Sequence, residues 1–340
     1  MPVALLNEMT PVQMEAGYLE YRRMCYKLLL QDAREQRLVD VLSEPRTFAE
    51  LVTNWSRGGD SATLQRLLAA LVSYAAMVTD NTGGVTRYKS VEGFQDTPID
   101  RDLMVTAVGA GQADKLLHAN SYANLVKVAR DGNNVVQSDF TAANSQMWDE
   151  FLSLPFYEYF RKSAVEALAA ACRPGGMLLD AACGLGYGIA ELRERLDVEA
   201  RIVGVDISHD FIAMAIDRTR DLDVALARLD LQRELPILAS NTFDGAMIIG
   251  AWHFLANPDE VLAELARLLR PGGVLAIGYY YTTDETFDRP IMDLRLRLRE
   301  PVARATEAAA LAAKAAELGL AVEQDFRIGC FGFTSFRMAE

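Results

Sequence analysis

A glycine-rich turn and two acidic residues follow apolar runs in this sequence, and these are the residues best placed to do chemistry. The run "GMLLDAACGLGYG" places Asp180 near the end of an expected strand and Gly184 and Gly186 in the turn after it. Glycine lets a backbone approach a ligand closely where a side chain would block it. An expected second strand, "RIVGVD", ends at Asp206, from which a carboxylate can accept hydrogen bonds from both hydroxyls of a ribose. The sequence therefore predicts a site for an adenosine-containing ligand.

The position of Asp180 discriminates between kinds of adenosine ligand. A dinucleotide site needs G-x-G-x-x-G after the strand, whereas here the order is Asp180 and then "AACGLGYG". A carboxylate in this turn would repel a pyrophosphate but suits an ammonium group. A nicotinamide dinucleotide is therefore disfavoured.

The stretch "GAWHFLANPDE" contains His253, one of three histidines in the chain. It follows "FDGAMIIG", which has the composition of a buried strand, so His253 is expected at a strand end. There it can act as a base or can form part of a pocket wall. Phe254 follows it directly and the nearest acid along the chain is Asp259, so no neighbouring carboxylate orients the ring. Both roles stay open.

From Gly176 onward the sequence alternates between expected strands and amphipathic helices. This alternation is typical of an open, mostly parallel sheet with helices on both faces. Ligands bind such sheets beyond the carboxyl ends of the strands. The acids, the glycine turn and His253 all fall at that edge.

Five segments in this half also resemble, in order, the motifs of class I S-adenosylmethionine-dependent methyltransferases. They are "LLDAACGLG", "VGVDIS", "LARLD", "FDGAMII" and "LLRPGGVLAIG". The resemblance covers roughly residues 170–280 and implies an α/β fold with a Rossmann-like seven-stranded sheet of strand order 3-2-1-4-5-7-6. It implies S-adenosyl-L-methionine as the cofactor and no metal. The implied cofactor-binding residues are Asp180, Gly184 and Gly186 at the methionine part, Asp206 at the ribose, Asp230 and Leu231 at the adenine, and Ile207, which follows Asp206 directly. Trp252 could cover the adenine.

The first hundred residues have a different pattern. A helical stretch over residues 11–42, a capping box of Thr47 and Glu50, a third helix from Ser61 and a turn at "DNTGG" together suggest a winged helix. A groove-docking helix needs several cations, but Arg66 is the single basic residue between Ser61 and Met77. Burial against a second subunit explains this apolar helix set better, and we expect a homodimer without nucleic acid. The arrangement resembles the dimerisation domain of small-molecule O-methyltransferases.

Length and composition set the outer bounds. A chain of 340 residues is expected to form more than one domain, and we assign residues 1–100 to a winged-helix-like dimerisation domain, 101–165 to connecting helices that contribute to the substrate pocket, and 166–340 to the cofactor-binding catalytic domain. The net charge of −13 argues against binding to nucleic acid or to an anionic membrane surface. No apolar run is long enough to span a membrane and no leader segment is evident, so we expect a cytoplasmic protein. The four cysteines form no CxxC pair.

The acceptor is expected to be a small molecule bound by aromatic residues and one cation. The predicted substrate residues are Trp148, Tyr157, Tyr279 and Arg289. Tyr280 and Tyr281 are alternatives to Tyr279, and Arg289 is chosen from a group that also contains Arg295, Arg297 and Arg299. Aromatic faces can surround a sulfonium, and an arginine can bind a carboxylate.

Two acceptor chemistries follow. The first is S-methylation of a thioether carboxylate such as 4-methylthio-2-hydroxybutyrate, a reaction that needs no base. It is suggested by the acidic composition and the chain organisation, which resemble those of the bacterial methylthiohydroxybutyrate S-methyltransferases of dimethylsulfoniopropionate biosynthesis. The alternative is O-methylation of an aromatic or polyketide hydroxyl with His253 as the catalytic general base.

Overall fold

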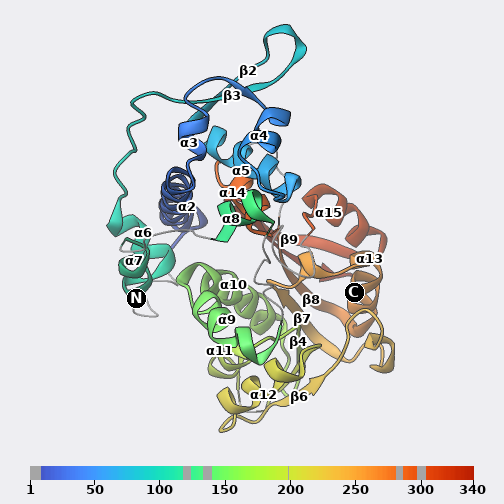
Figure 1. Ribbon diagram of the computed structural model, residues 1–340. Coiled ribbons are helices and arrows are strands. Elements are labelled where there is room, and N and C mark those ends of the chain that lie inside the picture. Colours follow the sequence, from blue (N-terminus) through green and yellow to red (C-terminus); the bar gives the residue numbers. More distant parts are fainter. Residues whose placement is uncertain (1–8, 118–123, 133–139, 198, 281–285, 297–303) are drawn as a thin grey trace. The chain divides into compact units, whose positions relative to one another are not determined.

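A computed structural model describes residues 9–117, 124–132, 140–197, 199–280, 286–296 and 304–340 (Figure 1). The chain divides into two compact units. The N-terminal unit comprises residues 1–138 and 283–302, and the sheet unit comprises residues 139–282 and 303–340. A segment that follows the fifth strand of the large sheet, residues 283–302, belongs to the N-terminal unit. The expected domain boundaries at residues 100 and 165 stay a prediction.

The sheet unit is built on a seven-stranded sheet of order β6-β5-β4-β7-β8-β10-β9 (Figure 1). Its strands are β4 (Met177–Ala181), β5 (Arg201–Asp206), β6 (Ala225–Arg228), β7 (Phe243–Ile249), β8 (Leu269–Tyr280), β9 (Leu320–Ile328) and β10 (Phe331–Met338). Strands β4 to β8 pair in parallel, and β10 runs antiparallel to both β8 and β9. Counted along the chain this is the order 3-2-1-4-5-7-6, so the predicted Rossmann-like methyltransferase sheet is confirmed.

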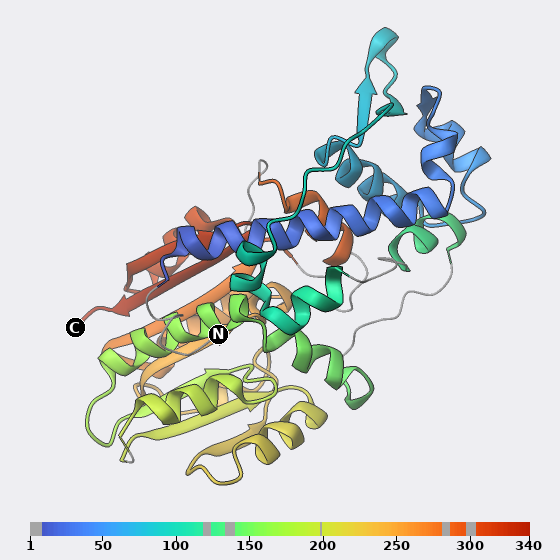
Figure 2. The same cartoon turned by 90° about the vertical axis from the view of Figure 1, so that its left-hand side faces the viewer.

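Helices cover both faces of this sheet (Figure 2). One face carries α10 (Pro155–Ala171), α11 (Tyr187–Arg195) and α12 (His209–Arg218), where α11 contacts both of the others. The other face carries α13 (Pro258–Leu268) and α15 (Ala308–Glu317). Along the chain, the short helix α9 (Ser145–Leu152) is followed by α10 and then by β4. Because β4 to β8 run parallel, their carboxyl ends lie at one edge of the sheet.

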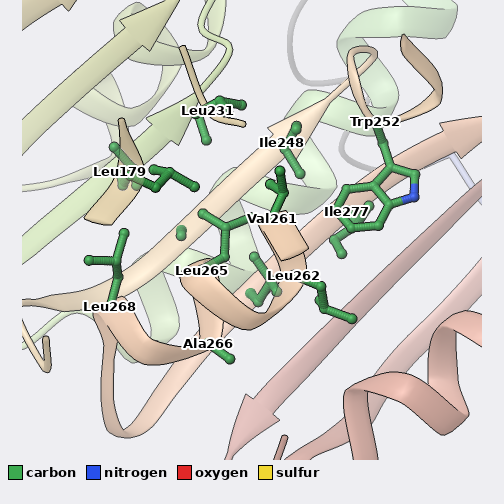
Figure 3. Packing of buried hydrophobic residues seen from close by; sticks show 14 of the residues in the cluster. Leu179, Leu231, Ile248, Trp252, Val261, Leu262, Leu265, Ala266, Leu268 and Ile277 are labelled. Carbon is green, nitrogen blue, oxygen red and sulfur yellow. The ribbon is translucent and has the colours of Figure 1, made fainter. Parts of the chain in front are cut away.

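The main core lies between the sheet and α13. Leu262, Leu265 and Leu268 of that helix are fully buried together with side chains from the strands, among them Ile248 and Ile277 (Figure 3). Burying a leucine side chain contributes about 1.5–3 kcal/mol to folding. This cluster fixes the strand ends that carry the candidate site.

In the N-terminal unit a long helix is followed by shorter elements. These are α2 (Pro11–Glu35), α3 (Leu38–Val41), β1 (Arg46–Thr47), α4 (Phe48–Asn54), α5 (Ser61–Ser73), β2 (Met77–Asp80) and β3 (Arg87–Ser90). The expected helix over residues 11–42 is interrupted, because Arg37 adopts a left-handed conformation with φ of 62°. The capping box of Thr47 and Glu50 is present at the start of α4. The strands form a small antiparallel sheet of order β1-β3-β2.

Further helices of this unit are α6 (Arg101–Val108), α7 (Ala110–Leu117), α8 (Asn124–Asp131) and α14 (Arg289–Leu296). The last of these follows β8 in the chain and packs against α5 and α2. Tyr18 of α2 donates a hydrogen bond to Asp288 at 2.8 Å, and Tyr26 donates to the Phe287 carbonyl at 2.7 Å. These bonds tie residues 286–296 to the N-terminal unit.

None of the helices that the structure describes is long and apolar enough to cross a membrane. Among the same residues, no group of three or more histidine, cysteine, aspartate and glutamate side chains is placed to hold a metal ion.

Candidate cofactor and acceptor site

The glycine turn after β4 depends on glycine at two positions. Gly184 and Gly186 have φ of 54° and 81°, a left-handed conformation that other residues adopt only with strain. A Cβ on Gly186 would also come within 3.1 Å of Ala215 Cβ. A Cβ added at Gly184 would have Leu152 Cδ1 as its nearest neighbour, 4.0 Å away, so the space beside this glycine is open. The turn therefore leaves backbone uncovered at the strand edge.

Asp206 is held rigidly at the end of β5. Its Oδ2 accepts a hydrogen bond from the Gly184 N–H at 2.9 Å, and its Oδ1 accepts one from the Ser208 N–H at 2.8 Å. Burial raises the pKa of this carboxyl, and the backbone N–H groups oppose that rise. Ile207 beside it is 47% exposed although it is apolar. A fixed carboxylate next to an exposed apolar side chain fits a ribose and the base attached to it.

Asp180 is a buried acid that lacks full compensation. It is 4% exposed, and burial together with the nearby Asp206 and Glu191 raises its pKa to about 8, although Arg161 opposes the rise. A Cβ on Gly188 would come within 2.6 Å of Asp180 Oδ2, so this glycine gives the carboxyl its room. A carboxyl in this state gains most from a cation. The residues present thus fit the ammonium group of an amino-acid cofactor.

Asp230 and Leu231 follow β6 as predicted, and the hydrogen bonds of Asp230 join it to residues two and four positions later. Asp230 Oδ1 accepts a hydrogen bond from the Gln232 N–H at 2.9 Å, and Leu231 is 7% exposed within the main core. Gln232 Oε1 accepts from the Ala256 N–H at 2.7 Å and thereby joins this loop to the one after β7. Contact of Asp230 and Leu231 with an adenine stays a prediction.

Trp252 and Tyr279 lie in the main core. Trp252 is 2% exposed and lies beside Ile277 in Figure 3. Tyr279 is 1% exposed, and its hydroxyl is 3.0 Å from Thr334 Oγ1. These positions favour packing roles, so their contact with cofactor and substrate stays a prediction. Tyr281 lies outside the described residues.

His253 begins a series of ring contacts at the strand edge. It is 6% exposed, and its ring centroid is 4.3 Å from that of Phe254. Phe254 is 5.4 Å from Phe140, which is 5.4 Å from Trp148. Trp148 packs on Phe211, in the helix after Asp206, at 6.4 Å. The histidine is thus joined to the cofactor edge through aromatic rings.

The series continues from Trp148 to the last strand. Trp148 lies 6.2 Å from Phe151, which lies 4.4 Å from Tyr157. Tyr157 lies 6.2 Å from Phe331, and Phe331 pairs in register with Tyr280 at the end of β8. We call this set the aromatic wall; its members are Phe140, Trp148, Phe151, Tyr157, Phe254 and Phe331. The structure brings the predicted Trp148 and Tyr157 together in it.

Sequence reasoning did not select Phe140, Phe254 and Phe331 as site residues. Phe140 is followed by a threonine and two alanines, and Phe331 begins β10 directly after a two-residue turn, so neither belongs to a recognisable motif. For Phe254 a signal was present, because it directly follows His253 after a buried strand. The wall depends on pairing between distant segments, which spacing along the chain does not reveal.

The predicted substrate cation is placed in the N-terminal unit. Arg289 Nε lies 2.9 Å from Asp293 Oδ1 within α14. Arg295 of the same helix donates a hydrogen bond to the Tyr21 hydroxyl at 3.1 Å. Arg297 and Arg299 lie outside the described residues. Binding of a substrate carboxylate by Arg289 stays a prediction.

Comparison with known proteins agrees with this geometry. Residues 179–277 match the family described as "Methyltransferase domain". The chain therefore contains a class I methyltransferase domain, and the cofactor of that domain is S-adenosyl-L-methionine. The match falls on strands β4 to β8, which carry the glycine turn and both acids.

Two curated methyltransferases are similar to part of this chain. The ubiquinone/menaquinone biosynthesis C-methyltransferase UbiE of Hydrogenovibrio crunogenus is 27% identical over 142 residues, which are 41% of this chain and 55% of the relative. The demethylmenaquinone methyltransferase of Symbiobacterium thermophilum is 32% identical over 104 residues, 30% of this chain and 41% of the relative. The chain thus spans about half the length of these curated relatives or less.

One solved structure is similar over nearly the whole chain. The CurJ carbon methyltransferase superposes with a TM-score of 0.57 at 14% identity, over 96% of this chain and 92% of that one. At this identity the likeness shows the fold alone. It extends beyond the sheet unit to the N-terminal helices.

Proposed function

We propose that this protein transfers a methyl group from S-adenosyl-L-methionine to a small organic molecule held against the aromatic wall. The proposal is carried by one observation: the Asp180 and Asp206 carboxyls, the glycine turn and the aromatic wall meet at the same edge of a methyltransferase sheet. When bound, the cofactor supplies an electrophilic methyl group on a sulfonium. Methyl transfer from it is an in-line displacement, for which alignment and exclusion of water are the main requirements.

The chain's own residues meet these requirements in different ways. Asp206 would accept hydrogen bonds from the ribose hydroxyls, and Asp180 would pair with the ammonium group. Ile207, Asp230 and Leu231 would border the adenine. The aromatic wall excludes water from the strand edge, since its rings pack with centroids 4.4–6.2 Å apart.

For the acceptor we favour a ring-bearing molecule that loses a proton as it is methylated. Flat apolar rings are the groups that an aromatic wall binds best. His253 lies beside Phe254 at this wall, where an imidazole can take a proton from a hydroxyl or an acidic carbon. An aromatic hydroxyl, or a hydroxyl on a polyketide ring, has both features. The names of the two curated relatives likewise refer to ring-bearing quinones.

A thioether carboxylate such as 4-methylthio-2-hydroxybutyrate is the second candidate. It is supported by the same wall, because aromatic faces stabilise a sulfonium product through cation–π interactions. This reaction needs no base, and His253 would then serve only as part of the pocket.

A panel of acceptors tests the proposal. Methyl transfer from labelled S-adenosyl-L-methionine is measured for phenols, β-dicarbonyl compounds and thioether carboxylates, with wild type, His253→Ala and His209→Ala as the exposed-histidine control. We expect activity on a ring-bearing acceptor that His253→Ala reduces by about 100-fold or more, while His209→Ala leaves it unchanged. Activity confined to thioethers and insensitive to His253→Ala would establish the second candidate.

We also infer that the N-terminal unit is a winged-helix-like dimerisation module and that the protein is a homodimer. The order β1, α4, α5, β2, β3 and the scarcity of cations on α5 support this, since Arg66 is its single basic residue. Its resemblance to O-methyltransferase dimerisation domains supports the same inference.

A further inference from the structure

A single carboxylate joins α9 to the cofactor turn. Asp149 Oδ1 accepts hydrogen bonds from the Tyr187 hydroxyl at 2.9 Å and from Arg218 Nη2 at 2.6 Å. The Arg218 guanidinium also lies over the Tyr187 ring, 3.7 Å from its centroid, and its Nε donates to the Leu185 carbonyl at 2.9 Å. Leu185 is the residue between the two turn glycines. We call Asp149, Tyr187 and Arg218 the clasp.

The segment that carries Asp149 is also fixed at both of its ends. The Ser208 hydroxyl donates to the Phe140 carbonyl, and the Ala142 N–H donates to Asp210 Oδ2 at 2.7 Å. At the other end Arg161 Nη1 donates to the Leu152 carbonyl at 2.6 Å. Ser208 stands two residues after the ribose acid Asp206. Residues 140–152, the cover segment, therefore attach to the loops that form the cofactor site.

The underside of the cover segment is apolar. Trp148 is 5% exposed and packs with Leu185 of the turn and with Phe211. The clasp itself is more open, since the side chains of Arg218 and Asp149 are 31% and 41% exposed. The Arg218 guanidinium is held by a carboxylate, an aromatic face and a carbonyl, which together fix its position. Because the pair with Asp149 is exposed to water, these contacts can also break and re-form.

We propose that Asp149, Tyr187 and Arg218 are positioning residues that hold the cover segment across the cofactor turn and thereby slow release of the spent cofactor. This inference rests on the proposed function, because it takes the turn after β4 as the cofactor site. The clasp acts through the Leu185 carbonyl and Trp148 and does not touch the reacting atoms. It sets how long the cofactor stays bound.

The test measures dissociation of S-adenosylhomocysteine, chased by excess S-adenosyl-L-methionine, in stopped flow with tryptophan fluorescence. Asp149→Asn keeps the side-chain volume and removes the charge, and Tyr187→Phe removes one hydroxyl. We expect the dissociation rate to rise about tenfold for Asp149→Asn and about threefold for Tyr187→Phe, as hydrogen bonds to a charged group predict. The double variant should fall short of the product of the two, because both act through the same oxygen.

Two controls separate the possible failures. Arg220→Ala breaks the exposed pair with Asp217 near the same helix end and should leave the rate unchanged. Amide hydrogen exchange of residues 140–152 should quicken in the clasp variants with S-adenosylhomocysteine bound. Unchanged rates and exchange in folded Tyr187→Phe would overturn the clasp, whereas absence of S-adenosylhomocysteine binding to the wild type would overturn the proposed function.

Discussion

Asp180 and Asp206 lie at the same edge of the sheet in different environments. Asp206 accepts backbone N–H bonds on both oxygens, which fixes its direction at the end of β5. Asp180 has its pKa raised to about 8 by burial, by Asp206 and by Glu191. Asp206 is therefore prepared for hydroxyl donors, and Asp180 is prepared for a cation that restores its charge.

The first prediction is that S-adenosyl-L-methionine binding at pH 6.5 releases about one proton. At this pH the Asp180 carboxyl of the free protein is protonated, because its pKa of about 8 lies above the pH. A free α-amino group has a pKa of about 7.7–8.0 and stays charged. An ammonium beside Asp180 favours the ionised carboxylate, so the proton leaves to the buffer.

Calorimetric titration in two buffers of different ionisation enthalpy measures this proton. The apparent binding enthalpy should differ between the buffers by their difference in ionisation enthalpy. Asp180→Asn cannot release the proton and should give equal enthalpies. Equal enthalpies for the wild type would show that Asp180 is already ionised in the free protein.

For single residues, the sequence indicates which side chains could do chemistry better than it indicates which residues they contact. The acids and glycines were evident from spacing because each lies within one strand and its turn. Trp252 and Tyr279 were selected as aromatic residues near strand ends, and the structure places both in the main core. An aromatic side chain at a strand end can point into the core or toward the site, and packing against segments distant in the sequence decides between the two.

At the scale of elements, the sheet order was predictable and the docking of α14 was not. Five motifs in sequence determine five parallel strands, and the tail supplies the antiparallel hairpin. Residues 286–296 come after β8 in the chain, so the sequence analysis assigned them to the cofactor-binding catalytic domain. These residues are bound to α2 by hydrogen bonds from tyrosine hydroxyls, such as the bond from Tyr26 to the Phe287 carbonyl, whose two residues are 261 positions apart.

The second prediction concerns this docking. Tyr26 is fully buried, donates to the Phe287 carbonyl at 2.7 Å and accepts from the Ile291 N–H at 3.3 Å. Tyr26→Phe leaves both backbone groups without this hydroxyl, so the free energy of unfolding should fall by about 1–3 kcal/mol.

Urea unfolding measures the change. Tyr88→Phe in β3 removes a hydroxyl from a half-buried tyrosine and serves as the control, with a change of about 0.5 kcal/mol or less. A Tyr26→Phe variant as stable as the wild type would show that the hydroxyl contributes nothing to the docking of residues 286–296.

For the whole molecule, composition gives an expectation about the class of partner, which stays a prediction. The net charge of −13 and the single basic residue of α5 oppose nucleic-acid binding. The acceptor was not predictable in the same way, because the aromatic wall is assembled from segments between residues 140 and 331.

The third prediction is that the chain forms a homodimer. Light scattering coupled to size-exclusion chromatography should give twice the chain mass of 37.5 kDa at micromolar concentration. Titration of duplex DNA at low salt should give no saturable binding. A monomer of 37.5 kDa that binds DNA with steep salt dependence would indicate that the N-terminal unit has a regulatory role instead.

Direct titration of the cofactor tests the central claim. We predict that the wild type binds S-adenosyl-L-methionine and S-adenosylhomocysteine in calorimetry and does not bind NAD. Asp206→Ala should weaken binding about 100-fold, since it removes two hydrogen bonds to a charged group, and the exposed-acid control Asp221→Ala should bind as the wild type does. Saturable binding of NAD, or S-adenosyl-L-methionine binding that Asp206→Ala leaves intact, would contradict the assignment of this edge of the sheet as the cofactor site.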